Sequence, residues 1–553
     1  MKLRRVPPSL GALALYLALS LFFFGGPVLR APDRVILGSG DDPNLFMWML
    51  AWWPHAIGHG LDPIVTHSLF APEGFNLMWT TSIPGPGLLV MPITLLAGPV
   101  VAFNVIALLA PVLSAFAAFL LCRHLTGRFW PSVVGGYVFG FSDFVLGAIW
   151  GGHLHLSLVP FLPLCALLVI RQVEGSLSSR RFVLLLGACL IGQFLISTEM
   201  LLLMTLFGGF AFAVTALLSE RRRQLANTAG MIALAYVAMA VVVSPLLYYT
   251  LFKSGTTPSA YPGVYASDLA NFVIPTGLTR VGRSDFQAIA QSFRGNMSEQ
   301  GAFVGIPLLV AIGLFAAQRP KRAGEWALVL TFVLAAVMSL GTRLHVAGAS
   351  ARIWLPWDLM THIPFARYAL PARALAAMFL VAGVMIALWL TRRPSVGKWL
   401  LVALGIVLIL PNRGLPRFHD SYRSPRFITA GLYKSRVSAR DRILILPFIR
   451  GGRAMRWQAE TGIAFPLAEG YSNRPPPSFT RWPIVKAMQS NRLRPDSDVQ
   501  MRRFLRARGV TVILVDRRHP GPWPGLFARM RLVPLNVGGV ILYRLQPPGR
   551  AGA

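Results

Sequence analysis

Long apolar stretches dominate this sequence and leave few folds open to it. Runs of about 15 to 25 apolar residues, the length of a helix that crosses a bilayer, recur through the first part of the chain. Because the bilayer core holds no water, such segments must satisfy their own backbone hydrogen bonds, which favours helices. The sequence therefore predicts an α-helical polytopic membrane domain over residues 1–411. About eleven transmembrane helices are expected, near residues 9–27, 100–121, 132–149, 156–170, 182–197, 201–218, 228–248, 302–317, 326–340, 373–390 and 399–411.

Composition excludes several other classes of protein. Of the 553 residues, 54% are hydrophobic and 13% charged, whereas soluble globular chains carry about 25% charged residues. The three cysteines, Cys122, Cys165 and Cys189, lie in or beside apolar stretches, so we expect no disulfide framework, cysteine zinc cluster or redox chemistry. The net charge of +32 does not predict nucleic-acid binding, because many basic residues lie between apolar stretches and not on one face of a soluble module.

The basic residues predict how the chain is oriented in a membrane. Lys2, Arg4 and Arg5 place the N-terminus in the cytoplasm, because short basic loops stay inside. We interpret the first stretch as an uncleaved anchor, because no small-x-small cleavage site follows Phe24. The outer loops are then 28–99, 150–155, 198–200, 249–301 and 341–372, in a multi-pass protein of a bacterial inner membrane. Every second loop is basic, as this orientation requires: Arg123–Arg128, Arg171–Arg181, Arg221–Arg223, Gln318–Arg322 and Arg392–Lys398.

An odd number of spans places the last segment, residues 412–553, on the periplasmic or extracellular side. Three stretches there read as strands, and the segment Val499–Arg508 reads as a helix, which predicts a small α/β domain. This tail carries no nucleophile elbow, phosphate loop or metal-ligand cluster. Its many arginines either attract anionic headgroups or an anionic glycan, or form an ordinary solvated surface. The three predicted strands are Arg442–Pro447, Val510–Val515 and Gly539–Tyr543.

The first outer loop, within 28–99, holds the most informative residues. Two adjacent carboxylates, Asp41 and Asp42, precede an aromatic segment that reads as a helix. Its indoles, Trp48, Trp52 and Trp53, are typical of a helix lying in the bilayer interface, which would hold the carboxylates at headgroup depth. The alternative is structural, because aspartate followed by proline commonly caps the start of a helix.

This arrangement resembles the GT-C superfamily of membrane glycosyltransferases, in particular mannosyl- and arabinosyltransferase-like enzymes that use polyprenyl-phosphate sugars. The segment Asp42-Pro43-x-x-Phe46 is similar to the Asp-Pro start in the oligosaccharyltransferase catalytic subunit, and Phe70–Leu77 follows as a comparable turn. The resemblance covers roughly residues 1–410 as architecture. It implies sugar transfer at the outer membrane face, with Asp42 as the catalytic residue.

The second outer loop departs from that family. The oligosaccharyltransferase subunit has an acidic metal-binding pair there, whereas this chain has His153 and His155 in Gly151–Leu156. Either histidine could donate a hydrogen bond to a phosphate or ligate a metal, but two histidines at the edge of a span are more often structural. No cofactor is certain from the sequence, and a divalent metal remains an alternative.

Charged residues at the ends of other spans complete the candidate site. Arg367 and Arg373 flank a span, where arginine is costly unless matched by a partner such as a lipid phosphate. Snorkelling to anionic headgroups is the alternative. Glu199 and Glu299 are more readily interpreted as solvated or capping carboxylates than as a second acid, with Glu199 the better candidate because so little loop surrounds it.

These residues predict a glycosyltransferase of hexosyl or pentosyl type. Asp42 is expected to act as general base and Asp41 to support it, while Arg367 and Arg373 hold the carrier phosphate. The expected partners are a polyprenyl-phosphate sugar, membrane lipids, and a glycan, lipid or protein acceptor. Two alternatives stay open: a transporter or flippase of envelope lipids or glycans, and a noncatalytic scaffold of envelope polysaccharide assembly. Transporters usually place polar residues at the midplane, whereas the acidic residues of this chain lie at the outer ends.

Overall fold

The computed structural model describes residues 8–253, 263–282, 285–318, 322–415, 418–421, 423–448, 453–472 and 475–545. The predicted cytoplasmic residues Lys2, Arg4 and Arg5, and the basic segment 319–321, lie outside the described residues. The chain forms two compact units. Unit 1 contains residues 1–30, 104–243 and 259–420, and unit 2 contains residues 31–103, 244–258 and 421–553.

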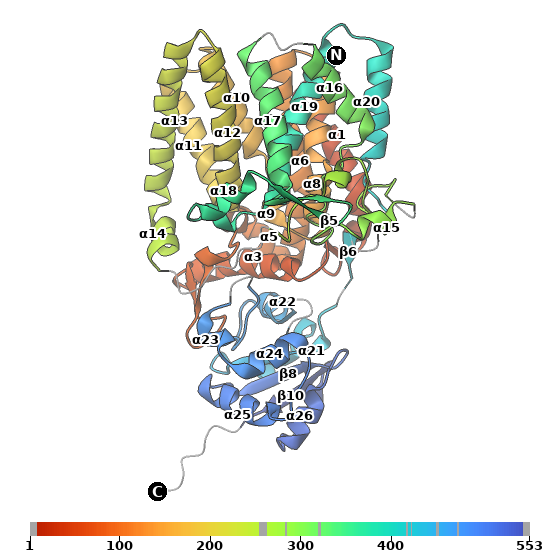
Figure 1. The fold of residues 1–553 in the computed structure, drawn as a ribbon. Helices are drawn as coiled ribbons and strands as arrows, with labels where there is room; N and C mark the ends of the chain where they lie inside the picture. The colour runs from red at the N-terminus through yellow and green to blue at the C-terminus, as the bar shows by residue number, and fades with distance from the viewer. Residues whose placement is uncertain are drawn as a thin grey trace, which may run out of the picture. The chain divides into compact units, whose positions relative to one another are not determined.

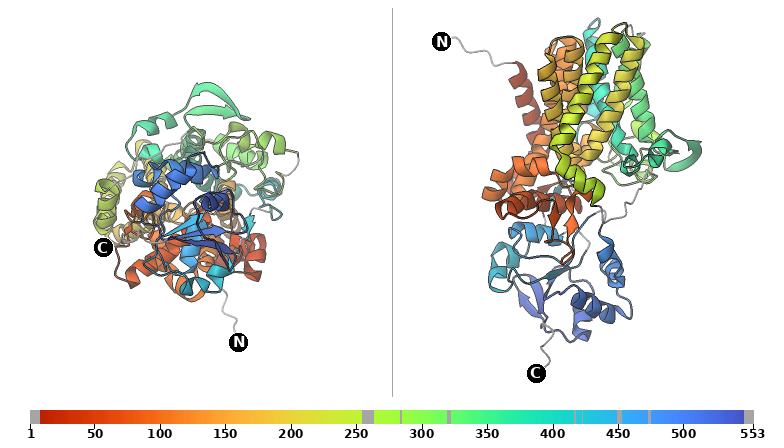
Figure 2. Two further views of the ribbon diagram at one scale, coloured as in Figure 1. Left: turned by 90° about the horizontal axis from the view of Figure 1, so that it is seen from below. Right: turned by 90° about the vertical axis from the view of Figure 1, so that its left-hand side faces the viewer.

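Unit 1 is a helical bundle. Figure 1 and the right-hand view of Figure 2 show α10, α11, α12 and α13 running side by side. Its main helices are α1 (Pro8–Ser20), α2 (Gly26–Arg30), α6 (Pro99–Thr126, from Asn104 onward), α7 (Phe129–Gly140), α8 (Asp143–Trp150), α9 (Leu154–Ser157), α10 (Phe161–Val173), α11 (Ser179–Ile196), α12 (Thr198–Leu218), α13 (Arg222–Val242), α16 (Ile306–Ala317), α17 (Ala323–Ser339), α19 (Leu375–Thr391) and α20 (Val396–Leu408). Figure 1 shows the turns α12–α13 and α19–α20 at the same end of this bundle. Two of the predicted basic loops therefore share one face of unit 1.

The chain is a multi-pass membrane protein, but the prediction of eleven full-length spans is not confirmed. Among the described residues, seven helices are long and apolar enough to cross a membrane, or eight if the bent pair α7 and α8 forms one span. The other three predicted spans correspond to α16, α17 and α20, which are apolar but have only 12, 17 and 13 residues. At about 1.5 Å per residue, such helices fall short of the bilayer core of about 30 Å.

Two glycines let helices α7 and α19 approach closely. A Cβ atom added to Gly383 would lie 2.5 Å from the carbonyl oxygen of Gly135, and one added to Gly135 would lie 2.8 Å from that of Gly383. Small residues at such crossings are typical of membrane helices, because lipid provides no hydrophobic force between helices and close backbone packing must hold them together.

Shorter elements of unit 1 lie at the end opposite the α12–α13 turn (Figure 1). The hairpin β4–β5 is held by Asp268, whose carboxylate accepts hydrogen bonds of 2.8 Å from the backbone nitrogens of Ala347 and Gly348. The short elements are η1 (Leu21–Gly25), η3 (Leu269–Phe272), α15 (Gln287–Ala290), β4 (Arg343–Val346), β5 (Ala349–Trp354), α18 (Trp357–His362), η4 (Ala366–Tyr368), η5 (Pro371–Ala374) and β6 (His419–Asp420).

Unit 2 combines the first outer loop with the tail of the chain. The first outer loop forms β1 (Ile36–Leu37), α3 (Asp42–Gly58), β2 (Val65–Thr66), β3 (Phe75–Asn76), η2 (Leu77–Trp79), α4 (Pro84–Leu89) and α5 (Met91–Ala97), and α14 (Ser244–Phe252) joins them. The tail forms α21 (Arg426–Thr429), η7 (Leu432–Ser435), β7 (Ile443–Leu446), α22 (Arg453–Glu460), α23 (Pro477–Thr480), α24 (Pro483–Ser490), α25 (Ser497–Ala507), β8 (Val512–Asp516), α26 (Trp523–Arg529), β9 (Leu535–Val537) and β10 (Val540–Arg544).

The tail contains one four-stranded sheet in the order β7-β8-β10-β9. Strand β7 runs parallel to β8, with Ile443 opposite Val512, while β10 is antiparallel to β8 and β9. Figure 1 shows α24, α25 and α26 beside these strands, and Phe527 of α26 contacts Tyr543 of β10 at 4.9 Å between ring centroids. All residues of β8 are buried, as expected for a strand covered on both faces. Strands β7, β8 and β10 and helix α25 lie at the four segments predicted from the sequence.

Candidate active site

Helix α3 begins at Asp42, and its first turn differs from the capping alternative. Asp41 occupies the N-cap position, but its side chain makes no hydrogen bond to the first turn. The carboxylate of Asp42 instead accepts a hydrogen bond of 2.7 Å from the hydroxyl of Tyr471. The carboxylate also lies at a helix N-terminus, where negative charge is favoured. The side chain of Asp42 is therefore oriented by Tyr471 and not by capping contacts of its own helix.

Tyr471 is a candidate site residue that the sequence did not reveal. It lies in the tail, 429 positions after Asp42, in a segment with no strand or helix pattern. No short motif connects it to the first outer loop.

Helix α3 is covered by protein along most of its length, so its indoles do not face lipid as the prediction of an interfacial helix requires. Trp48, Trp52 and Trp53 have exposed fractions of 0%, 1% and 4%. Their indole nitrogens donate hydrogen bonds within unit 2, to the Gln458 side chain at 2.6 Å and to the carbonyls of Pro63 at 2.9 Å and Ser82 at 2.8 Å. A helix that is apolar all round belongs in a protein core and leaves no separate face for lipid. The helix that carries Asp42 is therefore rigidly anchored by side chains.

The tail also holds the turn between β2 and β3, the predicted Phe70–Leu77 element. The buried guanidinium of Arg508 donates hydrogen bonds to the carbonyls of Phe70 and Ala468 and forms an ion pair of 2.9 Å with Glu73. The backbone nitrogen of Phe70 donates to the carbonyl of Glu469 at 2.9 Å. Together these contacts make the tail a structural support of the first outer loop.

Glu469, two residues before Tyr471, is a buried carboxyl group. It has an exposed fraction of 0%, and one of its oxygens accepts a hydrogen bond of 2.7 Å from the backbone nitrogen of Ile445. Burial raises the pKa of Glu469 well above its ordinary value, and that hydrogen bond offsets only part of the effect. Burial therefore favours the protonated form of this side chain.

A second charged group lies in unit 1 and contains two of the predicted residues. The guanidinium of Arg373 pairs with the carboxylate of Glu199 and lies 3.5 Å from that of Glu299. Glu199 also accepts a hydrogen bond of 2.7 Å from the backbone nitrogen of Leu370. Arg373 is thus matched by protein carboxylates, as a charge with so little exposure requires. This pairing differs from the prediction that Arg373 offers a positive charge to a phosphate.

The remaining predicted residues of unit 1 differ in accessibility. Arg367, in η4, is exposed, and its guanidinium lies 5.9 Å from the ring centre of Tyr368. His153 is half-buried and His155 is buried, with ring centroids 5.9 Å apart. Arg367 is accordingly the better placed of the two predicted arginines to bind a phosphate from solution.

His153 lies near the segment that carries Glu299. A Cβ atom added to Gly151 would lie 2.9 Å from both the His153 ring and the Ser298 side chain. Within the described parts of the chain, no three His, Cys, Asp or Glu side chains come together as a metal site.

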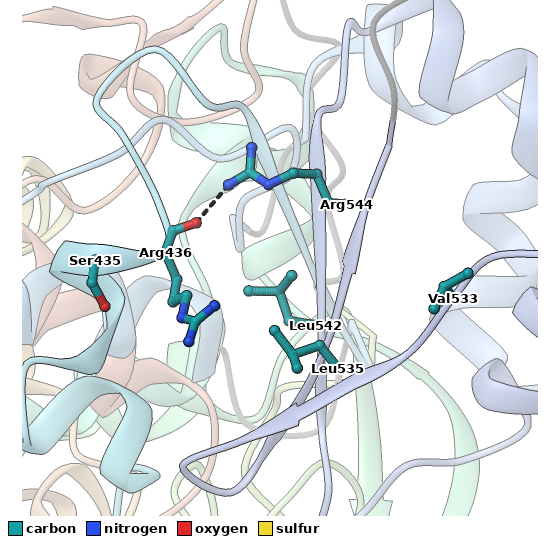
Figure 3. A pocket seen from close by; sticks show the side chains of 6 residues that line it. All are labelled: Ser435, Arg436, Val533, Leu535, Leu542 and Arg544. Atoms are coloured by element: carbon teal, nitrogen blue, oxygen red, sulfur yellow. Dashed lines mark hydrogen bonds between the residues drawn. The ribbon is translucent and has the colours of Figure 1, made fainter.

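The basic tail gathers two arginines around a pocket of about 400 Å³ in unit 2. Figure 3 shows the Arg436 guanidinium beside the side chains of Leu535 and Leu542, while Arg544 donates a hydrogen bond to the carbonyl of Arg436. Arg544 also pairs with Asp441 at 3.2 Å. Arg544 is therefore paired inside the tail, whereas Arg436 is exposed to solvent beside it.

Comparisons with known proteins establish the fold. A family model described as "Domain of unknown function (DUF6311)" matches residues 13–410, and no curated protein matches the chain. The structure is similar to the arabinofuranosyltransferase AftD from Mycobacteria, with a TM-score of 0.60 and 14% identity, over 97% of this chain and 39% of that one. This chain thus spans about two fifths of the length of AftD.

Two other solved structures have the same fold. The Archaeoglobus fulgidus oligosaccharyltransferase in the apo form has a TM-score of 0.55 and 11% identity, over 94% of this chain and 71% of that one. ArnT from Cupriavidus metallidurans bound to undecaprenyl phosphate has a TM-score of 0.50 and 11% identity, over 96% and 98%. At these identities the likeness concerns the fold alone. It confirms the GT-C-like fold that the first outer loop indicated.

Proposed function

The chain belongs to the family described as a domain of unknown function (DUF6311), and we propose that it is a membrane glycosyltransferase. It moves a sugar from a polyprenyl-phosphate carrier to a glycan, lipid or protein acceptor at the outer face of the inner membrane. The observation that carries the proposal is the hydrogen bond of 2.7 Å from Tyr471 to Asp42, at the start of the helix where the resemblance places the catalytic carboxylate. The fold shared with AftD, the oligosaccharyltransferase and ArnT supports the same class of reaction.

Asp42 serves as the general base in this proposal. As the acceptor oxygen attacks the anomeric carbon, its proton passes to the Asp42 carboxylate, the new glycosidic bond forms, and the bond between the sugar and the carrier phosphate breaks. The carrier phosphate leaves with the electron pair of that bond. Tyr471 donates to Asp42 and fixes the orientation of the carboxylate, and Asp41 adds negative charge beside it.

The proposed roles in unit 1 follow from accessibility. Arg367, which is exposed, stabilises the charge on the carrier phosphate. Arg373, held by Glu199 and Glu299, orders the loop that leads to α19 and contributes less charge to a ligand. Of the two predicted histidines, His153 is half-buried and is the one placed to donate a hydrogen bond to the substrate, while the buried His155 supports it.

Purified full-length protein in lipid nanodiscs can be incubated with radiolabelled polyprenyl-phosphate hexoses and pentoses, with envelope lipids and glycans as acceptors. A glycosyltransferase transfers label from one donor to an acceptor and releases the polyprenyl phosphate. A transporter or flippase moves a labelled lipid across proteoliposomes with no new product. A scaffold binds envelope components and does neither. Absence of transfer from every donor, together with flipping in proteoliposomes, would replace the proposal by the transporter alternative.

A further inference from the structure

A cavity of about 750 Å³ lies in unit 1 among the end of α8, residues 276–282 and 287–300, and residues 412–415 after α20. This volume falls within the range of about 300–1,000 Å³ typical of small-molecule sites. Although the chain carries a net charge of +32, the described residues that line the cavity include no charged side chain. The lining combines carboxamides, a hydroxyl, aromatic rings and glycine backbone.

Two exposed carboxamides and one buried hydroxyl of this lining have no hydrogen-bond partner among the described residues. Gln287 and Gln291 are four residues apart at α15, so they lie on the same side of that turn, and both are exposed. Neither carboxamide has a hydrogen-bond partner among the described residues. Thr276 is only 1% exposed, and its buried hydroxyl also has no partner there. A buried hydroxyl without a partner costs free energy that a ligand can recover.

Other lining groups keep the cavity in shape. The Gln300 side chain donates to the carbonyl of Phe293 at 3.0 Å, and the Asn412 side chain donates to that of Gly277 at 2.9 Å. These bonds fix the walls, so little ordering is required when a ligand binds. The rings of Trp150 and Phe293 add flat apolar surface.

We propose that this cavity binds an uncharged sugar residue. A sugar ring has neighbouring hydroxyls, which suit the donor and acceptor atoms of carboxamides, and an apolar C–H face, which suits an aromatic ring. A phosphate is a poor match, because phosphate sites use arginine, lysine or clustered backbone N–H groups. That this sugar belongs to the donor or the acceptor rests on the proposed function. That the cavity binds a sugar rests only on the residues that line it.

Equilibrium dialysis of the full-length protein in detergent, with radiolabelled methyl glycosides of neutral hexoses and pentoses, tests this assignment. At least one glycoside is expected to bind saturably at concentrations up to about 10 mM. Gln291→Ala and Thr276→Val should each weaken that binding about 10-fold, as expected for a lost hydrogen bond. Thr276→Val keeps the side-chain shape, and Gln291 is exposed, so neither change should unfold the protein. Gln500→Ala, in helix α25, is the matched control and should bind as the wild type does.

Three results would overturn the proposal: no saturable binding of any neutral glycoside, equal binding by the cavity variants and the wild type, or tighter binding of sugar 1-phosphates than of neutral glycosides. Because dialysis needs no turnover, it is independent of the proposed function. If the wild type binds a glycoside but transfers no sugar, the glycosyltransferase proposal is rejected and the sugar site stands. If it transfers sugar but binds no glycoside, the sugar site is rejected and the glycosyltransferase proposal stands.

Discussion

Asp42 and Tyr471 show how a single contact gives a role to a residue that has none in the sequence. A carboxylate at the start of a helix commonly caps that helix. The Asp42 carboxylate instead accepts a hydrogen bond from the hydroxyl of Tyr471, which lies 429 positions later in the chain. Hydrogen bonds to charged groups contribute about 1.5–3 kcal/mol, which is enough to fix one rotamer. The contact therefore gives Tyr471 a positioning role.

Tyr471→Phe is expected to lower the rate of sugar transfer by about 10-fold, because one hydrogen bond to a charged group is lost. It should also move the acidic limb of the pH–rate profile to higher pH, since the ionised base loses a donor that favours it. Tyr433→Phe is the matched control, because that hydroxyl donates only a long hydrogen bond of 3.5 Å elsewhere in the tail. A lower rate with an unshifted profile would leave Tyr471 with a structural role alone.

Glu469 gives the protein a pH dependence of stability. Its pKa is raised by burial, so the folded state keeps a proton that the unfolded chain releases near the ordinary value of 4.5. Stability should therefore fall as pH rises above about 4.5 toward the folded pKa. Glu469→Gln keeps an oxygen that accepts the hydrogen bond from Ile445, but it has no proton to lose. The difference between the thermal unfolding midpoints of this variant and the wild type should therefore change in favour of the variant from pH 5 to pH 8. Parallel curves for the two proteins would contradict the account.

At the scale of elements, close helix contacts and buried indoles hold the framework together. Helices α7 and α19 meet at Gly135 and Gly383, and α3 is fixed by hydrogen bonds from three tryptophans. The sequence predicted these segments as helices. Their environment was harder to predict, because an aromatic helix with indoles on several sides suits either a bilayer interface or a protein core.

Gly383→Ala should destabilise the protein by about 1–3 kcal/mol, because the added methyl group meets the backbone of α7 and the helices must separate. The measurement is the thermal unfolding midpoint in detergent. Gly208→Ala in α12 is the matched control, since no atom lies within 4 Å of the added Cβ, and alanine is the better helix former. If both variants unfold at the wild-type temperature, the contact between α7 and α19 is not a close one.

At the scale of the whole molecule, the predicted topology places the turn at Arg221 in the cytoplasm and both Asp33 and Arg503 outside. Single cysteines at these three positions, in a protein whose three native cysteines are replaced by alanine, can be labelled with an impermeant maleimide in cells whose inner membrane is sealed. The outer two should react, and the cysteine at Arg221 should react only after the membrane is opened. Labelling at Arg221 in sealed cells would overturn the topology.

The sequence predicted secondary structure best, because helices and strands depend on residues that are close together in the chain. Apolar stretches located the helices, and shorter apolar runs located β7, β8 and β10. A buried helix or strand can be recognised in this way because its apolar residues are close together in the sequence. Contacts across the chain have no such pattern. Arg373 and Glu199 are 174 positions apart, and their pairing, which neutralises an arginine predicted to bind phosphate, emerges only from packing. Tyr471 was missed for the same reason.

The most direct test of the central claim is sugar transfer by Asp42→Asn protein in nanodiscs, beside the wild type and Asp33→Asn. Asp33 is an exposed carboxylate of the same loop that pairs with Arg34, so its replacement controls for charge and expression. The account predicts that Asp42→Asn lowers transfer by about 10²- to 10⁴-fold with an unchanged unfolding midpoint, while Asp33→Asn transfers normally and Asp41→Asn shows a smaller loss than Asp42→Asn. Transfer by Asp42→Asn within a few-fold of the wild type would contradict it and leave Asp42 as a structural residue.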